Sequence, residues 1–345
     1  MPVLGVVGTM TELDLHLPVA EQPSIADYVD FAALGDRHGY DVAWVPETWG
    51  RNVVPILTEM ARATESIGVG PSILNVFSRS PALIGQTAAT LQEVADGRAR
   101  IGVGTSGPIV IEAWHGASFD HALKRVRETV EIAKAVQTGD VVDYDGSVFS
   151  LAGFRLRSDA PATPAPIDAA GMGPKSVELA GRFGDGWHGI VLGPDGIRER
   201  IFDFERGSDL GDRDRDDQRT MASVAAMVDD DDPDRARDLV RQHLAFYVAA
   251  MGDYYRQALA RQGYEDEANQ MAIDWGNGDV EAAKSAVTDE ILSEFAVVGT
   301  ADEARDQLAT FTAIDGLDAV AVGFPRAAEH ADIERSIEAL APESR

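Results

Sequence analysis

Three apolar runs decide the fold of this chain: Asp41-Val42-Ala43-Trp44-Val45-Pro46-Glu47, Ile67-Gly68-Val69-Gly70-Pro71-Ser72-Ile73-Leu74-Asn75 and Arg100-Ile101-Gly102-Val103-Gly104-Thr105-Ser106-Gly107. Each run ends in a polar or glycine-rich turn. The runs follow one another at intervals of roughly 30 residues, with one amphipathic helical pattern between each pair, which is typical of a parallel α/β fold. We therefore expect the polar residues of these turns to gather at one end of the sheet.

Signals for helix starts lie between these runs. Ser24 is a capping residue for a predicted helix that continues to His38, and a second helix is predicted around residues 55–66. Ser80-Pro81 predicts the start of a third helix, because proline at the first helical position needs no amide hydrogen. This third helix is expected to end at Asp96-Gly97.

The whole chain contains eight predicted strands, centred on Val3, Val42, Ile67, Ile101, Ile167, Trp187, Val224 and Val320. Eight parallel strands close into a (β/α)8 TIM barrel, whose functional residues lie in the loops after the C-terminal ends of the strands. We expect a single domain over residues 1–345 with two insertions. The first, at about residues 138–160, has a hairpin signal at Asp145-Gly146. The second, at about residues 230–295, is helical.

The composition excludes several classes of protein. The 345 residues are 45% apolar, which is enough for a large core, and none of them is cysteine. Disulfides, thiolate metal sites and a cysteine nucleophile are therefore excluded, and redox chemistry would need a cofactor. We find no apolar run of about 18 residues and no secretory leader pattern, so we expect a cytoplasmic protein with no membrane partner.

The net charge is strongly negative. The chain has 58 acidic and 30 basic residues, which gives a net charge of −28. Such a surface repels nucleic acid and anionic membranes, so no nucleic-acid partner is expected. We interpret the charge as a halophilic adaptation, because the screening length shortens to about 3 Å in molar salt and self-repulsion then costs little.

Several motifs resemble the bacterial luciferase-like superfamily. They extend in order over nearly the whole chain: the run from Gly39 to Glu47, Ser80-Pro81-Ala82, the run from Asp96 to Gly104, Asp168-Ala169-Ala170-Gly171-Met172-Gly173-Pro174, Asp185-Gly186-Trp187 and residues 298–316. Three further motifs are similar to the branch of this superfamily that uses coenzyme F420, typified by methylenetetrahydromethanopterin reductase. These are Pro46-Glu47-Thr48-Trp49-Gly50-Arg51-Asn52, Thr105-Ser106-Gly107-Pro108 and Glu112-Ala113-Trp114-His115-Gly116.

The resemblance implies an oxidoreductase on an eight-stranded barrel. In this branch a hydride passes between C5 of coenzyme F420 (8-hydroxy-5-deazaflavin) and a small-molecule substrate, in a homodimer or higher homo-oligomer. Two alternatives stay open: a luciferase-like monooxygenase that uses FMN, and a non-catalytic flavin-binding barrel.

Cofactor-binding residues are predicted in three turns. Gly171-Met172-Gly173-Pro174-Lys175 ends one strand and opens a helix, where backbone donors, the helix dipole and Lys175 favour a phosphate. Gly104, Thr105, Ser106 and Gly107 follow the fourth strand, and the resemblance implies that they contact the cofactor. The resemblance also implies a cis peptide bond behind the flavin ring at Ser72-Ile73, with Asn75 where the third strand leaves the barrel.

The candidate reaction cluster comprises Glu47, Trp49, Glu112 and His115, in the loops after the second and fourth strands. A carboxylic acid desolvated by tryptophan has a raised pKa and can exchange a proton as hydride moves. We expect Glu47 and Glu112 each to act either as this acid/base or as a positioning residue. Glu12, placed after the predicted first strand, is a weaker candidate.

A histidine acid/base directly after Glu47 is excluded. Some relatives have a histidine after the acid at this place, whereas this chain has Thr48. The histidines are scattered along the sequence, so no metal site is predicted. Residues 141–156 and 247–275 are expected to line the substrate pocket.

Overall fold

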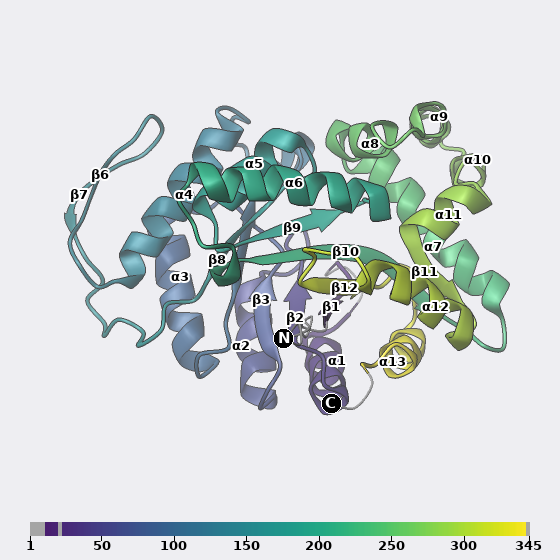
Figure 1. The fold of residues 1–345 in the computed structure, drawn as a ribbon, viewed down its shortest axis with the longest axis horizontal. Helices are drawn as coiled ribbons and strands as arrows, with labels where there is room; N and C mark the ends of the chain where they lie inside the picture. The colour runs from purple at the N-terminus through teal and green to yellow at the C-terminus, as the bar shows by residue number, and fades with distance from the viewer. Residues whose placement is uncertain (1–10, 20–22, 343–345) are drawn as a thin grey trace, which may run out of the picture.

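The computed structural model describes residues 11–19 and 23–342 (Figure 1). Its strands are β1 (Glu12–His16), β2 (Val42–Val45), β3 (Gly68–Pro71), β4 (Leu74–Asn75), β5 (Ile101–Gly104), β6 (Val142–Asp145), β7 (Ser150–Phe154), β8 (Ile167–Ala170), β9 (Gly186–Ile190), β10 (Arg219–Val228), β11 (Ala296–Gly299) and β12 (Ala319–Gly323). Its helices are α1 (Ile25–His38), α2 (Val53–Ala63), α3 (Pro81–Val94), α4 (Ala122–Gln137), α5 (Pro174–Phe183), α6 (Pro194–Leu210), α7 (Pro233–Ala250), α8 (Asp253–Ala260), α9 (Glu265–Gly276), α10 (Val280–Ser285), α11 (Asp289–Phe295), α12 (Ala301–Thr312) and α13 (His330–Ala339), with a π-helix η1 (Val110–Trp114) and a 3-10 helix η2 (Arg215–Asp217).

Eight strand positions close into a parallel barrel. The hydrogen-bonded order is β3-β2-β1-β12-β10-β9-β8-β5-β4. β3 and β4 are two parts of one strand, interrupted at Ser72-Ile73; β3 pairs with β2, β4 pairs with β5, and a bridge between Val69 and Ala99 completes the ring. β11 pairs with the C-terminal half of β10 outside this order. The predicted (β/α)8 TIM barrel is confirmed.

The first barrel strand is not the predicted one. The predicted strand around Val3 lies outside the described residues, and β1 pairs with both β2 and β12. Leu13 and Leu15 of β1 belong to the hydrophobic core, whereas Asp14 and His16, which alternate with them, are buried polar residues. Successive side chains of a strand face opposite sides, so this strand presents polar groups to the barrel interior. A search for continuous apolar runs overlooks such a strand.

A buried ion-pair network occupies the N-terminal end of the barrel. Arg219, the first residue of β10, donates to both carboxylate oxygens of Asp14 at 2.8 Å and to Glu12 at 2.8 Å. Trp44 Nε1 also donates to Asp14, at 2.8 Å. Burial alone would lower the pKa of Arg219, but Asp14 and Glu12 raise it. Glu12 therefore begins β1 at the end opposite the functional loops, and its predicted place after the first strand is wrong.

The observed helix caps explain where the first helices begin. Ser24 caps α1, and Ser80 caps α3 with Pro81 in its first turn, as predicted. α2 begins at Val53, slightly earlier than predicted, because the side chain of Asn52 caps it. Each cap satisfies a first-turn N–H group that has no acceptor within its helix.

Two inserted segments interrupt the alternation of barrel strands and helices. β6 and β7 form the predicted hairpin, which stands out beyond α3 and α4 (Figure 1). Its turn is held by Glu128 of α4, which accepts from the backbone N–H groups of Ser147, Val148 and Phe149 at 2.7, 3.0 and 2.9 Å. The helices α7 to α11 lie between β10 and β11 in the chain and gather at the other side of the molecule. Within the described ranges, no helix combines the length and apolar character needed to cross a membrane.

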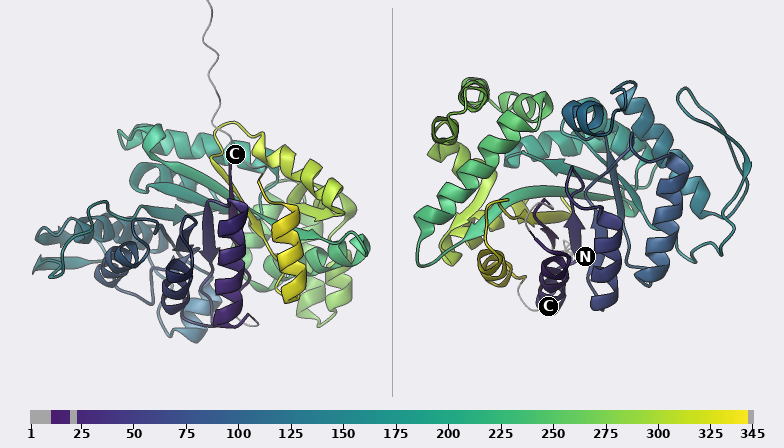
Figure 2. Two further views of the ribbon diagram at one scale, coloured as in Figure 1. Left: turned by 90° about the horizontal axis from the view of Figure 1, so that it is seen from below. Right: turned by 180° about the vertical axis from the view of Figure 1, so that it is seen from behind.

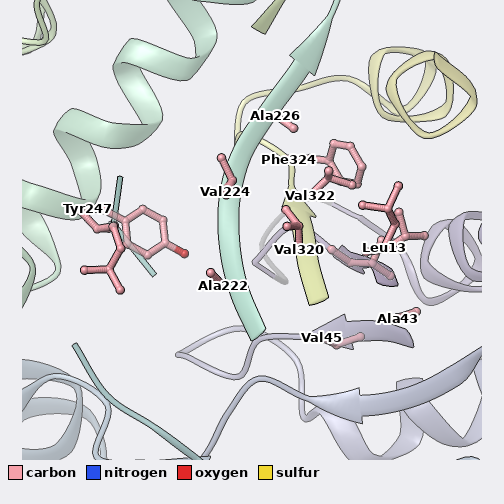
Figure 3. Close-up of a cluster of buried hydrophobic side chains, with 14 of the residues drawn as sticks. Leu13, Ala43, Val45, Ala222, Val224, Ala226, Tyr247, Val320, Val322 and Phe324 are labelled. Carbon is pink, nitrogen blue, oxygen red and sulfur yellow. The ribbon is translucent and has the colours of Figure 1, made fainter. Parts of the chain in front are cut away.

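The hydrophobic core lies between the barrel and its helices. Figure 3 shows Val320 and Val322 of β12 near Leu13, while Tyr247 of α7 approaches Ala222 of β10 from the other side. α1 and α13 lie side by side (Figure 2), which joins the first helix of the chain to the last. The core therefore surrounds the strands, and their C-terminal ends remain available for a site.

Candidate active site

Two adjacent cavities lie at the C-terminal ends of the barrel strands. The larger, which we call the mouth cavity, has a volume of about 440 Å³ and is lined from β5, β8, β9 and α8 and the loops that follow the strands. The smaller, the barrel cavity, has a volume of about 100 Å³ and reaches His16 and Ser223. Both are lined by Ile73, Ser106, Ala170, His188, Ile190 and Tyr255. The mouth cavity has a size typical of a cofactor or small-molecule site.

Most of the predicted cofactor residues line the mouth cavity, namely Ile73, Gly104, Thr105, Ser106, Gly171, Met172, Gly173, Pro174 and Lys175. Ser72 lines the barrel cavity instead. Asn75 and Gly107 line neither of the two. Asn75 is buried and accepts from the backbone of Phe77 at 3.1 Å, and a Cβ on Gly107 would lie 2.8 Å from the carbonyl oxygen of Met251. The cofactor-binding roles of Asn75 and Gly107 stay predictions.

The peptide bond between Ser72 and Ile73 is cis, as the resemblance implies. It lies in the interruption between β3 and β4, beside both cavities. Gly104 of β5 packs against it, because a Cβ on Gly104 would come within 3.2 Å of Ile73 Cγ1. A side chain at position 104 would therefore press on the wall that separates the two cavities.

The start of α5 forms a positively charged corner of the mouth cavity. Pro174 is the first residue of α5, so the N–H groups of the next two residues have no acceptor within the helix. Arg261, which sequence analysis did not single out, follows α8, and its Nη2 lies 3.9 Å from the Cβ position of Gly173. Burial and repulsion from Arg200 lower the pKa of Arg261. With Lys175 on the same wall, this corner favours an anionic group.

Glu47 lines the barrel cavity, but its surroundings differ from the predicted ones. Arg79 forms a two-point ion pair with it, in which Nη2 lies 2.9 Å from Oε2, and the N–H of Val53 donates to Oε2 at 3.1 Å. Tryptophan does not desolvate this carboxylate as expected, because Trp49 is 38% exposed and lines a separate crevice. Both oxygens of Glu47 are engaged, which favours positioning of the loop over proton exchange.

The other two members of the predicted cluster lie at η1. Glu112 is exposed, and neither Glu112 nor His115 lines either of the two cavities. His115 Nε2 lies 3.5 Å from Nδ2 of the buried Asn75. The structure thus brings only Glu47 of the four residues to these cavities. The catalytic roles of the cluster stay predictions.

Sequence analysis missed a buried polar group beside the cis bond. His188 of β9 lines both cavities; its Nε2 lies 3.0 Å from Oδ2 of Asp168, and its Nδ1 lies 3.1 Å from Ser72 Oγ. Arg100 contacts both oxygens of Asp168, at 2.5 and 2.7 Å. Burial alone would raise the pKa of Asp168, but the Arg100 guanidinium and the His188 ring hold it well below its usual range. The available signal was a polar residue within each of two short buried strands, since such residues need partners.

Two further histidines lie close to this group. His16, at the end of β1, lines the barrel cavity, and burial lowers its pKa to about 4. The ring of His243 of α7 is tilted by 49° against Tyr247 with 4.8 Å between ring centroids, and burial, with His16 and Arg326, lowers its pKa to about 3. His16 and His243, distant in the sequence, line one small cavity together. Over residues 11–19 and 23–342, no group of three or more potential ligands is arranged to hold a metal ion.

Comparison with known proteins gives a family match and a similar relative for this chain. The family model for luciferase-like monooxygenases matches residues 6–316. The 5,10-methylenetetrahydromethanopterin reductase of Archaeoglobus fulgidus is 32% identical over 284 residues, which are 81% of this chain and 83% of the relative.

Two solved structures share the architecture. The coenzyme F420-dependent tetrahydromethanopterin reductase from Methanopyrus kandleri matches with a TM-score of 0.82 and 22% identity, over 96% of this chain and 98% of the other. An F420-dependent secondary alcohol dehydrogenase in complex with an F420-acetone adduct matches with a TM-score of 0.77 and 22% identity, over 96% of this chain and 99% of the other. At these identities the two matches establish the fold.

Proposed function

We propose that this chain, which belongs to the luciferase-like monooxygenase family, is a coenzyme F420-dependent oxidoreductase. It transfers a hydride between C5 of the deazaflavin and a small-molecule substrate. The observation that carries this proposal is the mouth cavity, which nine of the residues predicted to bind the cofactor line. The similarity to a reductase named for a one-carbon pterin substrate supports the same reaction class.

The residues of the mouth cavity fit the coenzyme. When bound, the coenzyme supplies the hydride chemistry, and the protein supplies binding, orientation and exclusion of water. Lys175, Arg261 and the free N–H groups at the start of α5 would hold its phosphate. Thr105 and Ser106 contribute hydroxyl groups to the lining of the same cavity, and Ile73 contributes an apolar side chain.

The first test measures hydride transfer directly. Purified protein is mixed with reduced coenzyme F420 and 5,10-methylenetetrahydromethanopterin, or with oxidised coenzyme F420 and either glucose 6-phosphate or isopropanol, and the absorbance of the oxidised coenzyme is followed. We expect turnover with the pterin. Tighter binding of FMN than of coenzyme F420, with consumption of oxygen, would support the monooxygenase alternative. Binding of coenzyme F420 without hydride exchange in any mixture would support a non-catalytic flavin-binding barrel.

The charged corner predicts a specific loss of cofactor affinity. Lys175→Ala and Arg261→Ala are each expected to raise the Kd for coenzyme F420 about tenfold, because each removes one charge-assisted contact to phosphate. The Kd is measured by titration at one fixed potassium chloride concentration. Lys124→Ala is the matched control, since Lys124 is exposed and does not line the mouth cavity. Equal Kd values for all three variants and the wild type would show that the phosphate does not bind at this corner.

The ion pair at Glu47 predicts a loss of stability. Glu47→Gln keeps the shape of the side chain but leaves Arg79 without its charged partner at a site where both side chains are about 10% exposed. We expect the free energy of unfolding to fall by about 1–3 kcal/mol in a urea titration. Glu112→Gln, at an exposed position, should change it by less than about 0.5 kcal/mol. If Glu47→Gln kept its stability but lost most of its turnover, Glu47 would be the acid/base and not a positioning residue.

We also propose a cytoplasmic location and a homodimeric or higher assembly for the protein. The acidic composition supports the first proposal, since it matches a saline cytoplasm. Sedimentation velocity in molar potassium chloride checks the second.

A further inference from the structure

We propose that Ser72, His188 and Asp168 form a proton relay that opens into the barrel cavity and exchanges, with the substrate, the proton that accompanies hydride transfer. This inference rests on the proposed function and adds the acid/base that the reaction needs. It assigns proton exchange to a buried histidine that lines the barrel cavity beside a serine hydroxyl, in place of the predicted carboxylates.

The relay is continuous from the protein interior to the cavity. Arg100 contacts Asp168 at 2.5 and 2.7 Å, Asp168 lies 3.0 Å from His188 Nε2, and His188 Nδ1 lies 3.1 Å from Ser72 Oγ. Asp168 is 1% exposed and His188 is 5% exposed. Ser72 and His188 both line the barrel cavity, and His188 also lines the adjacent mouth cavity. The hydroxyl at the cavity is therefore coupled to a buried charge by two hydrogen bonds.

The partners of His188 define where its proton lies. Asp168 is ionised, because Arg100 holds its pKa below the usual range, so it can only accept. His188 therefore donates Nε2–H to Asp168, and its Nδ1 carries the lone pair. Ser72 Oγ–H donates to that lone pair, which leaves the lone pairs of Oγ for a group in the cavity. This is the arrangement in which a carboxylate orients a histidine that accepts a proton from a hydroxyl.

The surroundings hold the ring in place and set its electrostatics. The Trp44 ring packs edge-on against His188 with 4.4 Å between centroids, and a Cβ on Gly102 would lie 2.8 Å from His188 Cε1. Gly102 thus leaves the space that the imidazole occupies. The charged and titratable groups around His188 are Asp168 and, behind it, Arg100, the buried His16, and three groups on the same cavity, Glu47, Tyr247 and Tyr255. Of these, His16 is neutral near pH 7, because burial lowers its pKa to about 4.

A purely structural polar pair would not need this geometry. Arg100 and Asp168 already satisfy one another, yet Asp168 also orients a histidine whose second nitrogen meets a cavity-lining hydroxyl. The other acid on the same cavity, Glu47, is engaged by Arg79 on both oxygens. Among these groups, the hydrogen-bonded chain of Ser72, His188 and Asp168 is therefore the connected route for proton exchange with a substrate in the barrel cavity.

The proposed step balances atoms and electrons. In reduction, the hydride adds to a substrate carbon with its electron pair, and one electron pair of the carbon-heteroatom bond moves onto the oxygen or nitrogen. For this direction His188 first takes up a proton from water at Nδ1; Nδ1–H then donates to Ser72 Oγ, and Oγ–H donates to the substrate atom. That atom takes the proton of Ser72 Oγ as Ser72 takes the proton from Nδ1, and His188 returns to its neutral Nε2–H form. In oxidation each transfer runs in the opposite direction, and His188 exchanges its proton with water between turnovers.

The kinetic test separates proton transfer from structure. Ser72→Ala is expected to lower kcat about 10²-fold, to leave the Kd for coenzyme F420 within about twofold, and to flatten the pH profile of kcat. Ser72→Thr should restore kcat to within about tenfold, because it restores a hydroxyl. Ser285→Ala, at an exposed serine of α10, is the matched control. An unchanged pH profile and kcat in Ser72→Ala would overturn the relay, whatever happened to stability.

A spectroscopic test needs no substrate. In protein labelled with nitrogen-15 at histidine, His188 should show the Nε2–H tautomer, with and without coenzyme F420, and Asp168→Asn should shift it toward Nδ1–H. Ser72→Ala should change the Nδ1 chemical shift by loss of its donor. A His188 that carries its proton on Nδ1 in the wild type would overturn the proposal. Failure of coenzyme F420 to bind would refute the proposed function instead, and the tautomer would still decide the relay.

Discussion

Replacement of Arg219 by methionine is expected to lower the free energy of unfolding by about 3–5 kcal/mol, because it removes one partner of a buried ion pair. Asp14 is fully buried and the Arg219 side chain is 12% exposed, so the carboxylate left behind cannot recover its hydration. The two residues come from the first and seventh barrel strands, 205 residues apart in the chain. Urea unfolding followed by circular dichroism, in molar potassium chloride, measures the loss.

Two comparisons show that the loss comes from an unpaired charge. Arg198→Met removes an exposed ion pair with Asp195 and should change the stability by less than about 1 kcal/mol. The double variant Asp14→Asn with Arg219→Met leaves no uncompensated buried ion, since Glu12, the other partner of Arg219, is 41% exposed and can be hydrated. It should therefore be more stable than Arg219→Met alone. If Arg219→Met proves as stable as Arg198→Met, the network does not hold the N-terminal end of the barrel together.

The protein is expected to lose its folded structure below about 0.5 M salt and to regain it as salt is added, because the screening length falls from about 10 Å at 0.1 M to about 3 Å at 1 M. Its net charge of −28 places many like charges within the longer of these distances. The melting temperature is measured across a series of potassium chloride concentrations. A melting temperature that does not depend on salt would contradict the halophilic interpretation.

A charge-reduced variant controls for the general effect of salt on folded proteins. Asp216, Asp217 and Asp231 are exposed, and their replacement by asparagine removes three negative charges with little change in shape. This variant should fold at a lower potassium chloride concentration than the wild type. A matched variant that replaces exposed Gln270 with glutamate should need a higher concentration.

Local signals in the sequence predicted most of the barrel because they depend on neighbouring residues. The caps at Ser24 and Ser80 were predictable, since a helix start is decided by hydrogen bonds within one turn. The apolar runs of β2, β3 and β5 were predictable for a similar reason. β1 was not, because Asp14 and His16 break its apolar pattern and are tolerated only where Arg219 and the barrel interior supply partners.

The residues of the candidate site also fall into those that the sequence predicted and those that it did not. The glycine-rich turns at Gly104 and Gly171 were identified from the sequence, because each follows a strand and a barrel gathers such turns at one end. The cis bond at Ser72-Ile73 was located through the family resemblance. Glu47 was identified as a residue of the site, but its partner Arg79, 32 residues away, was not.

The barrel, the turns that line its mouth cavity and the family could all be read from the sequence, since they depend on periodicity, turn chemistry and ordered motifs. Which side chains meet inside the barrel became known only from the three-dimensional structure. Ser72 and His188 are separated by 116 residues, and His188 and Asp168 by 20, so no local pattern records their contact. Closure of the ring brings three strands to one point, and there a buried carboxylate, an imidazole and a hydroxyl can satisfy one another.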